Sequence, residues 1–161
     1  MRILILLLVF PILIHAMPFP SIKAKSLTNK SIRVPNQSNR QLLILGFDMK
    51  SSEPMEAWVR ALNLTPSSNI SWLQMPVIGR VPPFVNGFIK KGMKKSIPKK
   101  IHGQFAPYLG KKKTDIIRAI SHRDELSDPI TPFIIIINDA GEIQFNLQAN
   151  VTTKNTELVK A

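Results

Sequence analysis

Apolar residues follow two different periods along the chain, and the change from one to the other predicts a mixed order of strands and helices. Residues 42–47 and 133–137 are continuous apolar runs of strand length, typical of strands buried on both faces of a sheet. Helical spacing recurs over residues 55–62 and 84–95. Weaker patterns predict strands at 22–27, 31–34, 70–78 and 142–147, and helices at 114–120 and 153–160.

The predicted order is a hairpin, a βαβ unit, a helical segment and a final ββα unit. Residues 51–54, Ser-Ser-Glu-Pro, favour a helix start, because a hydroxyl accepts free amides there and proline is tolerated in the first turn. Thr114 or Asp115 is the expected cap of the later helix. Residues 138–141 predict the turn of the last hairpin. This alternation indicates an α/β domain with a central mixed sheet covered by helices.

The first 16 residues have the pattern of an export signal. A short positive start precedes the apolar run Ile3–Ile14, and Ala16 offers a small residue for cleavage. We therefore expect a signal peptide at 1–16 and an exported protein, in a bacterial periplasm or secreted, or anchored in the inner membrane if the signal is not cleaved. The remaining chain divides into an N-terminal extension at 17–40 and a domain at 41–161.

Residues 131–143, with the sequence TPFIIIINDAGEI, resemble the thioredoxin-family segment in which a proline precedes an apolar strand, a glycine turn and a second strand. In that family the proline is cis and faces the start of the active-site helix. The resemblance therefore implies a cis bond before Pro132. The alternative interpretation is a proline that simply opens a strand.

The front half supports the same resemblance. Residues 42–47 followed by Ser52-Glu53-Pro54-Met55 lie where periplasmic thioredoxin-like proteins carry a strand and a Cys-x-Pro-Cys helix start. The expected fold is a thioredoxin-like three-layer sandwich. Ser52 and Met55 stand at the two cysteine positions, and the sequence has no cysteine. Thiol–disulfide exchange needs sulfur as both attacking and leaving group, so we expect no thiol oxidoreductase and no enzyme of that type.

From residue 42 to its end the chain also resembles the mitochondrial ATP synthase assembly chaperones and their bacterial thioredoxin-like relatives. Phe47, Trp58, the pair Gly92-Met93 and the late Ile-Asn-Asp-Ala-Gly-Glu-Ile hairpin carry this likeness. The resemblance implies a non-redox thioredoxin fold, and the eukaryotic members assist a membrane subunit of the synthase. The N-terminus departs from that family because it lacks the amphipathic, arginine- and serine-rich character of a transit peptide.

Positive charge is concentrated in one segment. The formal net charge is +12, and twelve of the 22 lysines and arginines lie in residues 79–123, where Asp115 is the one acid. We interpret this segment as a basic insertion that contacts an anionic membrane surface or an acidic protein, or that is a solvated face. Nucleic acid is disfavoured, because few aromatic residues interleave with the lysines. The candidate basic surface comprises Lys90, Lys91, Lys94, Lys95, Lys99, Lys100, Lys111, Lys112 and Lys113.

The former redox site is the second candidate site. Ser52, Glu53, Pro54 and Met55 would face Thr131 and Pro132 across a groove. That groove binds an extended peptide without reacting with it, or it is an unoccupied remnant. No cofactor or metal is expected, since the chain has no cysteine and few histidines.

These observations lead to one functional hypothesis and its alternatives. The hypothesis is an exported, non-redox binding or assembly protein that acts at a membrane face and has a protein partner or an anionic lipid surface. One alternative is a non-thiol enzyme or metal-binding protein that uses the cluster His122 to Glu125. The other is an inert structural relative.

Overall fold

The computed structural model describes residues 18–36 and 40–161, so the predicted signal peptide at 1–16 lies outside the described residues. Within them, no helix combines the length and apolarity that crossing a membrane requires. The elements, in chain order, are β1 Ile22–Lys25, β2 Ser31–Val34, β3 Gln41–Gly46, the 3₁₀ helix η1 Met49–Ser51, α1 Ser52–Ala61, β4 Ser71–Pro76, α2 Pro83–Ser96, the 3₁₀ helix η2 Lys99–Ile101, α3 Lys113–Ser121, β5 Phe133–Ile137, β6 Ile143–Gln148 and α4 Thr153–Lys160.

A four-stranded mixed sheet forms the centre, in the order β4-β3-β5-β6. Strand β3 runs parallel to β4 and antiparallel to β5, and β5 pairs antiparallel with β6. Every residue of β3 and β5 is buried, which explains the continuous apolar runs at residues 42–47 and 133–137. Strand β6 lies at an edge and alternates between half-buried and exposed positions.

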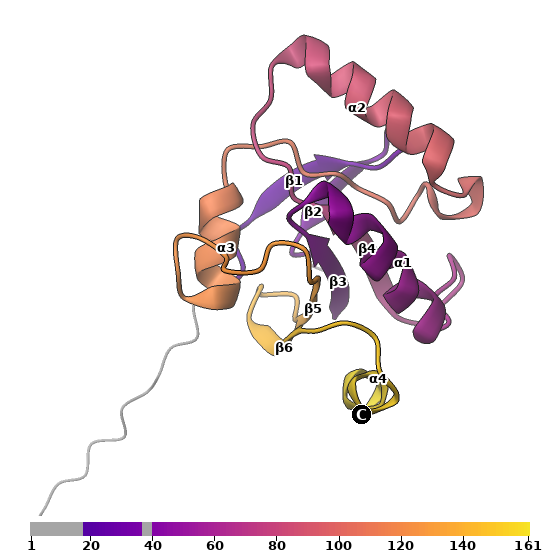
Figure 1. Ribbon diagram of the computed structural model, residues 1–161, viewed down its shortest axis with the longest axis vertical. Helices are drawn as coiled ribbons and strands as arrows, with labels where there is room; N and C mark the ends of the chain where they lie inside the picture. The colour runs from indigo at the N-terminus through magenta and orange to yellow at the C-terminus, as the bar shows by residue number, and fades with distance from the viewer. Residues whose placement is uncertain (1–17, 37–39) are drawn as a thin grey trace, which may run out of the picture.

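Two layers cover the sheet, one on each face (Figure 1). Leu43 and Leu45 of β3 belong to a core that includes Ile22 of the hairpin and Ile116 of α3. Leu42 and Ile44 face the opposite core, where Trp58 of α1 is completely buried. Because successive strand residues point to opposite faces, one strand supplies both cores. The predicted α/β three-layer sandwich with a central mixed sheet is confirmed.

The N-terminal hairpin forms a sheet of its own. Strands β1 and β2 pair antiparallel, with Ile22 opposite Val34 and Lys25 opposite Ser31. Ile22, Ala24 and Val34 are buried against the first core. The hairpin therefore packs on the domain as part of a covering layer.

A segment without regular structure runs along the outer edge of β4. The amide of Gln74 donates to the Gln104 carbonyl at 2.9 Å, and the amide of Ala106 donates to the Gln74 carbonyl at 3.0 Å. Farther along, the amide of Tyr108 donates to the Pro76 carbonyl at 2.8 Å. These bonds pair the backbone groups of a strand edge that would otherwise be open.

Helix α2 confirms the helix predicted from the spacing over residues 84–95, but its apolar residues do not all face the domain. None of its residues is buried. Val85, Ile89 and Met93 are half-buried, whereas Phe84 and Phe88 are 73% and 75% exposed. The helix therefore rests on the domain by a narrow apolar face and leaves two phenylalanines in contact with solvent.

The helix caps also differ from expectation. The predicted helix start at 51–54 is the start of α1, but Ser51 at its N-cap makes no side-chain capping bond. Asp48 instead caps the preceding η1 by accepting the Lys50 amide at 2.8 Å. Helix α3 begins at Lys113, one residue earlier than predicted, and neither Thr114 nor Asp115 caps it. Thr152 caps α4 by accepting the Asn155 amide at 3.1 Å.

Candidate functional site

The position of the redox centre in the thioredoxin fold lies where β3 ends and η1 and α1 begin. Gly46 ends β3 directly against Ser51 and the thioether of Met55. Ser51 is completely buried, and its hydroxyl donates to the Pro129 carbonyl at 3.0 Å and accepts the Asp48 amide at 3.3 Å. This serine joins the start of α1 to a loop 78 residues away.

The six predicted groove residues divide between surface and core. Ser52 and Glu53 are exposed, Pro54 is half-buried, and Met55 is 1% exposed within the α1 core. On the facing loop, Thr131 is half-buried and Pro132 is buried. The two segments approach each other through Ser51 and Pro129, which were not among the six predicted groove residues.

The expectation of a cis bond before Pro132 is wrong. Among the described residues the cis peptide bond is Val34-Pro35, so Thr131-Pro132 is trans. Pro132 directly precedes β5 and opens that strand, which was the alternative interpretation. Asp128 shapes the loop before it, because its carboxylate accepts the amides of Ile130 and Thr131 at 3.0 and 3.1 Å.

A cavity of about 560 Å³ opens beside the start of α1, between the ends of β3 and β4 and the helix α2. We call it the α1–α2 groove. Ser52 is the predicted groove residue that lines it, and Asp48 and Lys113 supply charge. Its apolar walls come from Phe47, Met49, Val77, Phe88, Ile89 and Met93.

Two exposed apolar side chains stand among the groove residues. Met49 is 92% exposed and belongs to η1, whereas Phe88 is 75% exposed and belongs to α2. Exposed apolar residues that border a concave apolar surface are typical of binding sites. The sequence signal for this wall was the helical spacing of residues 84–95, but the period could not show that the helix would face the redox position.

The predicted basic surface separates into two parts. Lys90, Lys91, Lys94 and Lys95 lie on α2, and η2 continues the first part with Lys99 and Lys100. The second part, residues 111–113, lies at the start of α3, where Lys113 faces the α1–α2 groove. Figure 1 shows α2 and α3 as separate helices, but Lys113 lines the same groove as Phe88 and Met93 of α2.

Carboxylates do not neutralise these lysines. In the part of the chain that the structure describes, the ion pairs are Arg60 with Glu56 and Arg118 with Asp124. The pKa of Lys90 lies below its ordinary value, first because the ammonium group is partly buried and then because Lys25 and Lys94 repel it. The surface around α2 therefore carries positive charge that an anion would stabilise.

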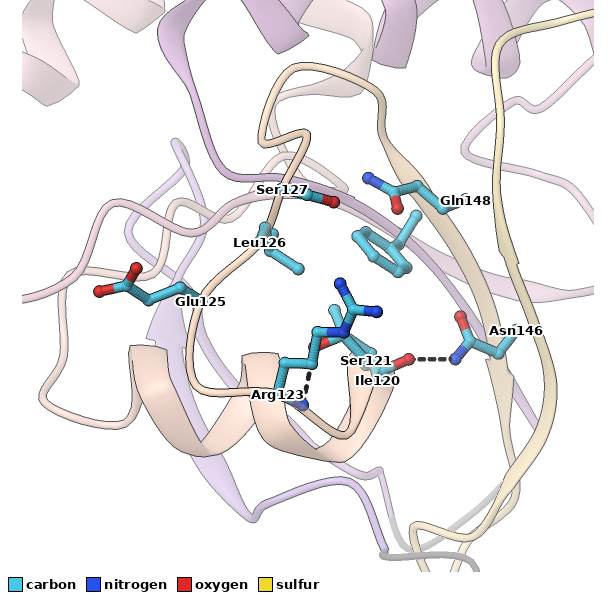
Figure 2. A pocket seen from close by; sticks show the side chains of 9 residues that line it. Ile120, Ser121, Arg123, Glu125, Leu126, Ser127, Asn146 and Gln148 are labelled. Carbon is cyan, nitrogen blue, oxygen red and sulfur yellow. Dashed lines mark hydrogen bonds between the residues drawn. The ribbon is translucent and has the colours of Figure 1, made fainter.

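The alternative cluster, His122 to Glu125, lies beside a second cavity of about 380 Å³ (Figure 2). Arg123 points into this cavity, whereas Glu125 points away from it. Asp124 pairs with Arg118, whose hydrogen bond and charge lower the pKa of that carboxyl group. His122 ends α3 in a left-handed conformation with φ of 56°. The cluster thus does not bring an acid and a base together.

Metal-binding groups are also dispersed. Across residues 18–36 and 40–161, His, Asp and Glu side chains do not gather in threes around a point that could hold a metal ion. The ring of His102 is engaged by the Ile97 carbonyl, which lies 2.9 Å from Nε2.

Both tryptophans belong to the core. Trp58 is 0% exposed and donates its indole N–H to the Ala149 carbonyl at 2.8 Å. Trp72 is 4% exposed and donates to the Thr65 carbonyl at 2.8 Å. They fill space and satisfy backbone carbonyls, which is the usual role of buried indoles.

Comparison with known proteins identifies the fold. No family model and no curated protein sequence matches the chain. Solved structures do: the exposed lipoprotein thioredoxin of Streptococcus pneumoniae has a TM-score of 0.55 and 10% identity, over 88% of this chain and 98% of that one. StoA from Bacillus subtilis has a TM-score of 0.55 and 14% identity, over 91% of this chain and 99% of that one. BsSco, of the Sco family of cytochrome c oxidase assembly proteins, has a TM-score of 0.59 and 8% identity, over 91% of each chain.

The structural neighbours establish the fold. The chain has a thioredoxin-like fold, and its sequence contains no cysteine. Several relatives are thiol–disulfide proteins by name, such as a thiol:disulfide interchange protein from Chlorobium tepidum. This chain shares their architecture without the sulfur atoms that such chemistry requires.

Proposed function

We propose that this chain is a non-redox binding or assembly protein that acts at a membrane face and holds an apolar segment of a partner protein in the α1–α2 groove. The observation that carries the proposal is the apolar groove at the redox position of a fold that here has no cysteine. Without a thiol, the groove can bind a partner but cannot carry out thiol–disulfide exchange. Its apolar walls suit an uncharged partner segment, and Asp48 and Lys113 would orient the segment.

The structural relatives support an assembly role within this proposal. BsSco belongs to a family of cytochrome c oxidase assembly proteins, so the same fold serves the assembly of a membrane complex in that family. The likeness of the sequence to the ATP synthase assembly chaperones belongs to the same proposal. A partner that spans a membrane would carry apolar segments of the kind that the groove suits.

The proposed location follows from charge and from the N-terminal segment. The apolar run in residues 3–14 has the length and flanks of an export signal, which would place the protein in a periplasm or outside the cell. The lysines of α2, which have no carboxylate partner among residues 18–36 and 40–161, would then meet an anionic lipid surface or an acidic partner. A solvated, unused basic face is the competing interpretation.

Selection of random phage-displayed peptides on the folded protein tests the groove. We expect the selected peptides to be apolar and their binding to weaken at least about tenfold in Phe88→Ser, because the side chain supplies apolar contact area. Phe84→Ser is the matched control, since Phe84 lies on the same helix with nearly the same exposure but outside the groove.

Two results would contradict the groove proposal. One is a selection that yields no peptide, and the other is a set of peptides that bind Phe88→Ser as tightly as the wild-type protein. Fluorescence anisotropy with labelled peptides measures both. Circular dichroism of each variant establishes that the exposed substitutions leave the fold intact.

A further inference from the structure

The outward side of α2 carries one line of exposed residues. Phe84, Phe88, Lys91 and Lys95 are spaced by four, three and four positions, so they share one side of the helix. All four are exposed. Two phenylalanines occupy the N-terminal half of this line and two lysines the C-terminal half. Apolar and charged residues are therefore separated along the length of the helix as well as around its axis.

The remaining sides of α2 explain why this line faces outward. Val85, Ile89 and Met93 are half-buried toward the domain, which holds the helix in place. Figure 1 shows α2 at the outer limit of the molecule, away from the central sheet. A flat surface can therefore approach the outward line without meeting the sheet.

The charged residues of α2 itself are all positive. Helix α2 contains no aspartate or glutamate, and its last turn carries Lys94 and Lys95. The side chains of Lys23, Lys25 and Lys90 surround a cavity of about 510 Å³ between the hairpin and α2. Mutual repulsion of these ammonium groups favours a bound anion at the flank of the helix.

We propose that α2 docks on an anionic phospholipid bilayer, with Phe84 and Phe88 in the lipid interface and Lys91 and Lys95 at the phosphate headgroups. Helices that lie in a membrane interface commonly combine phenylalanine with nearby lysine. Their lysine side chains extend along the apolar surface and place the ammonium groups at the headgroups. This inference rests on the proposed function, because it names the surface that the membrane face presents. Since Phe88 also lines the α1–α2 groove, docking brings that groove to the bilayer, where apolar partner segments emerge.

Vesicle co-flotation of the full chain tests the docking surface. The probes are vesicles of equal parts phosphatidylcholine and phosphatidylglycerol, compared with vesicles of phosphatidylcholine alone. We expect binding to the mixed vesicles that weakens as salt increases, because the lysines supply the attraction. Phe84→Ser should weaken it about tenfold, and Lys91→Gln and Lys95→Gln about fivefold each.

Helix α4 supplies matched controls. Leu158 is 49% exposed, so Leu158→Ser removes an exposed apolar residue elsewhere, and Lys154→Gln and Lys160→Gln remove charge there. We expect these variants to bind like the wild type. The apolar residues 3–14 are the same in every variant, so a difference between variants reports on α2.

Insertion is measured separately with Phe84→Trp. Brominated lipid should quench this tryptophan, whereas Trp58 and Trp72 are buried and provide a constant background. Equal binding of Phe84→Ser and wild type to mixed vesicles would overturn the proposal. A second result would also overturn the proposal: polyglutamate displaces the protein from vesicles and binds wild type and Phe84→Ser equally well. That result would assign the surface to an acidic protein.

The same variants separate this inference from the groove. Phe84→Ser should lose vesicle binding and keep peptide binding, since Phe84 does not line the groove. Vesicle binding by a protein that selects no peptide would contradict the groove alone. Peptide binding by a protein that ignores anionic vesicles would contradict the docking alone.

Discussion

Gly46 shows how closely backbone and side chains approach at the redox position. A Cβ built on this residue would lie 2.7 Å from Cβ of Ser51 and still closer to Sδ of Met55. The thioether is the end of a flexible side chain, but Ser51 is held by its bonds to Pro129 and Asp48. Any side chain at residue 46 must therefore displace the start of α1.

Gly46→Ala should lower the free energy of unfolding by about 1–3 kcal/mol through this overpacking. Gly87→Ala is the control, because a Cβ there meets nothing within 4 Å and alanine favours helices. We expect that substitution in α2 to stabilise by about 0.5–1 kcal/mol at most. Urea denaturation measures both changes in the free energy of unfolding. A Gly46→Ala variant as stable as the wild type would contradict the prediction, because the start of α1 would then shift at little cost.

Asp128 links local charge to the loop that contacts Ser51. Hydrogen bonds from Thr131, then the backbone amide of Ile130, lower the pKa of the Asp128 carboxyl group below its ordinary value. A lowered folded pKa means that the ionised form stabilises the folded state. This contribution is complete above the ordinary pKa of 3.8 and is lost as the pH falls through the folded value.

Asp128→Ala should therefore lower Tm by a small amount at neutral pH. The difference from wild type should shrink as the pH falls below about 4, when the wild-type carboxylate is protonated. Thermal unfolding followed by circular dichroism across this range measures it. Asp139→Ala, in the β5–β6 turn, serves as the control, and a difference that stays constant with pH would contradict the assignment.

At the scale of elements, α1 and the segment after β6 are joined by one buried side chain. The indole of Trp58 crosses from α1 to the Ala149 carbonyl, next to the residues that lead into α4. Trp58→Phe keeps an aromatic ring but leaves that carbonyl without its donor. We expect a loss of about 1–3 kcal/mol in unfolding free energy by urea denaturation, the cost of an unsatisfied acceptor at the half-buried Ala149.

The matching variant Trp72→Phe removes the bond to the Thr65 carbonyl, which belongs to the loop after α1. We expect it to cost less, because Thr65 is exposed and water can replace the donor. Equal losses in the two variants would mean that ring volume, and not the hydrogen bond, decides the effect.

Helix α2 marks the limit of prediction from pattern. Its period predicted a helix because apolar residues recur every three or four positions. The period could not show which of these residues face the domain, however, because Phe84 and Phe88 are as apolar as residues that are buried. Only the tertiary structure shows that Val85, Ile89 and Met93 face inward and that the phenylalanines do not.

At the scale of the whole molecule, the predicted fold was confirmed because its strongest signals are local. Residues 42–47 and 133–137 read as buried strands because burial on both faces leaves no polar position. The geometry of the candidate site could not be predicted, because it depends on contacts between distant parts of the sequence. Ser51 meets Pro129 across 78 residues, and no local pattern reports such a bond. Whether a bond before proline is cis or trans likewise depends on small energies set by tertiary contacts.

The segment that runs beside β4 determines how other chains can meet the sheet. Its backbone bonds to Gln74 and Pro76 occupy the outer side of that strand, so a foreign strand finds no free amides or carbonyls at those residues. The opposite border of the sheet is β6, whose exposed positions are Gln144, Asn146 and Gln148. A strand from another chain would therefore have to approach the sheet along β6, where the exposed side chains are polar amides.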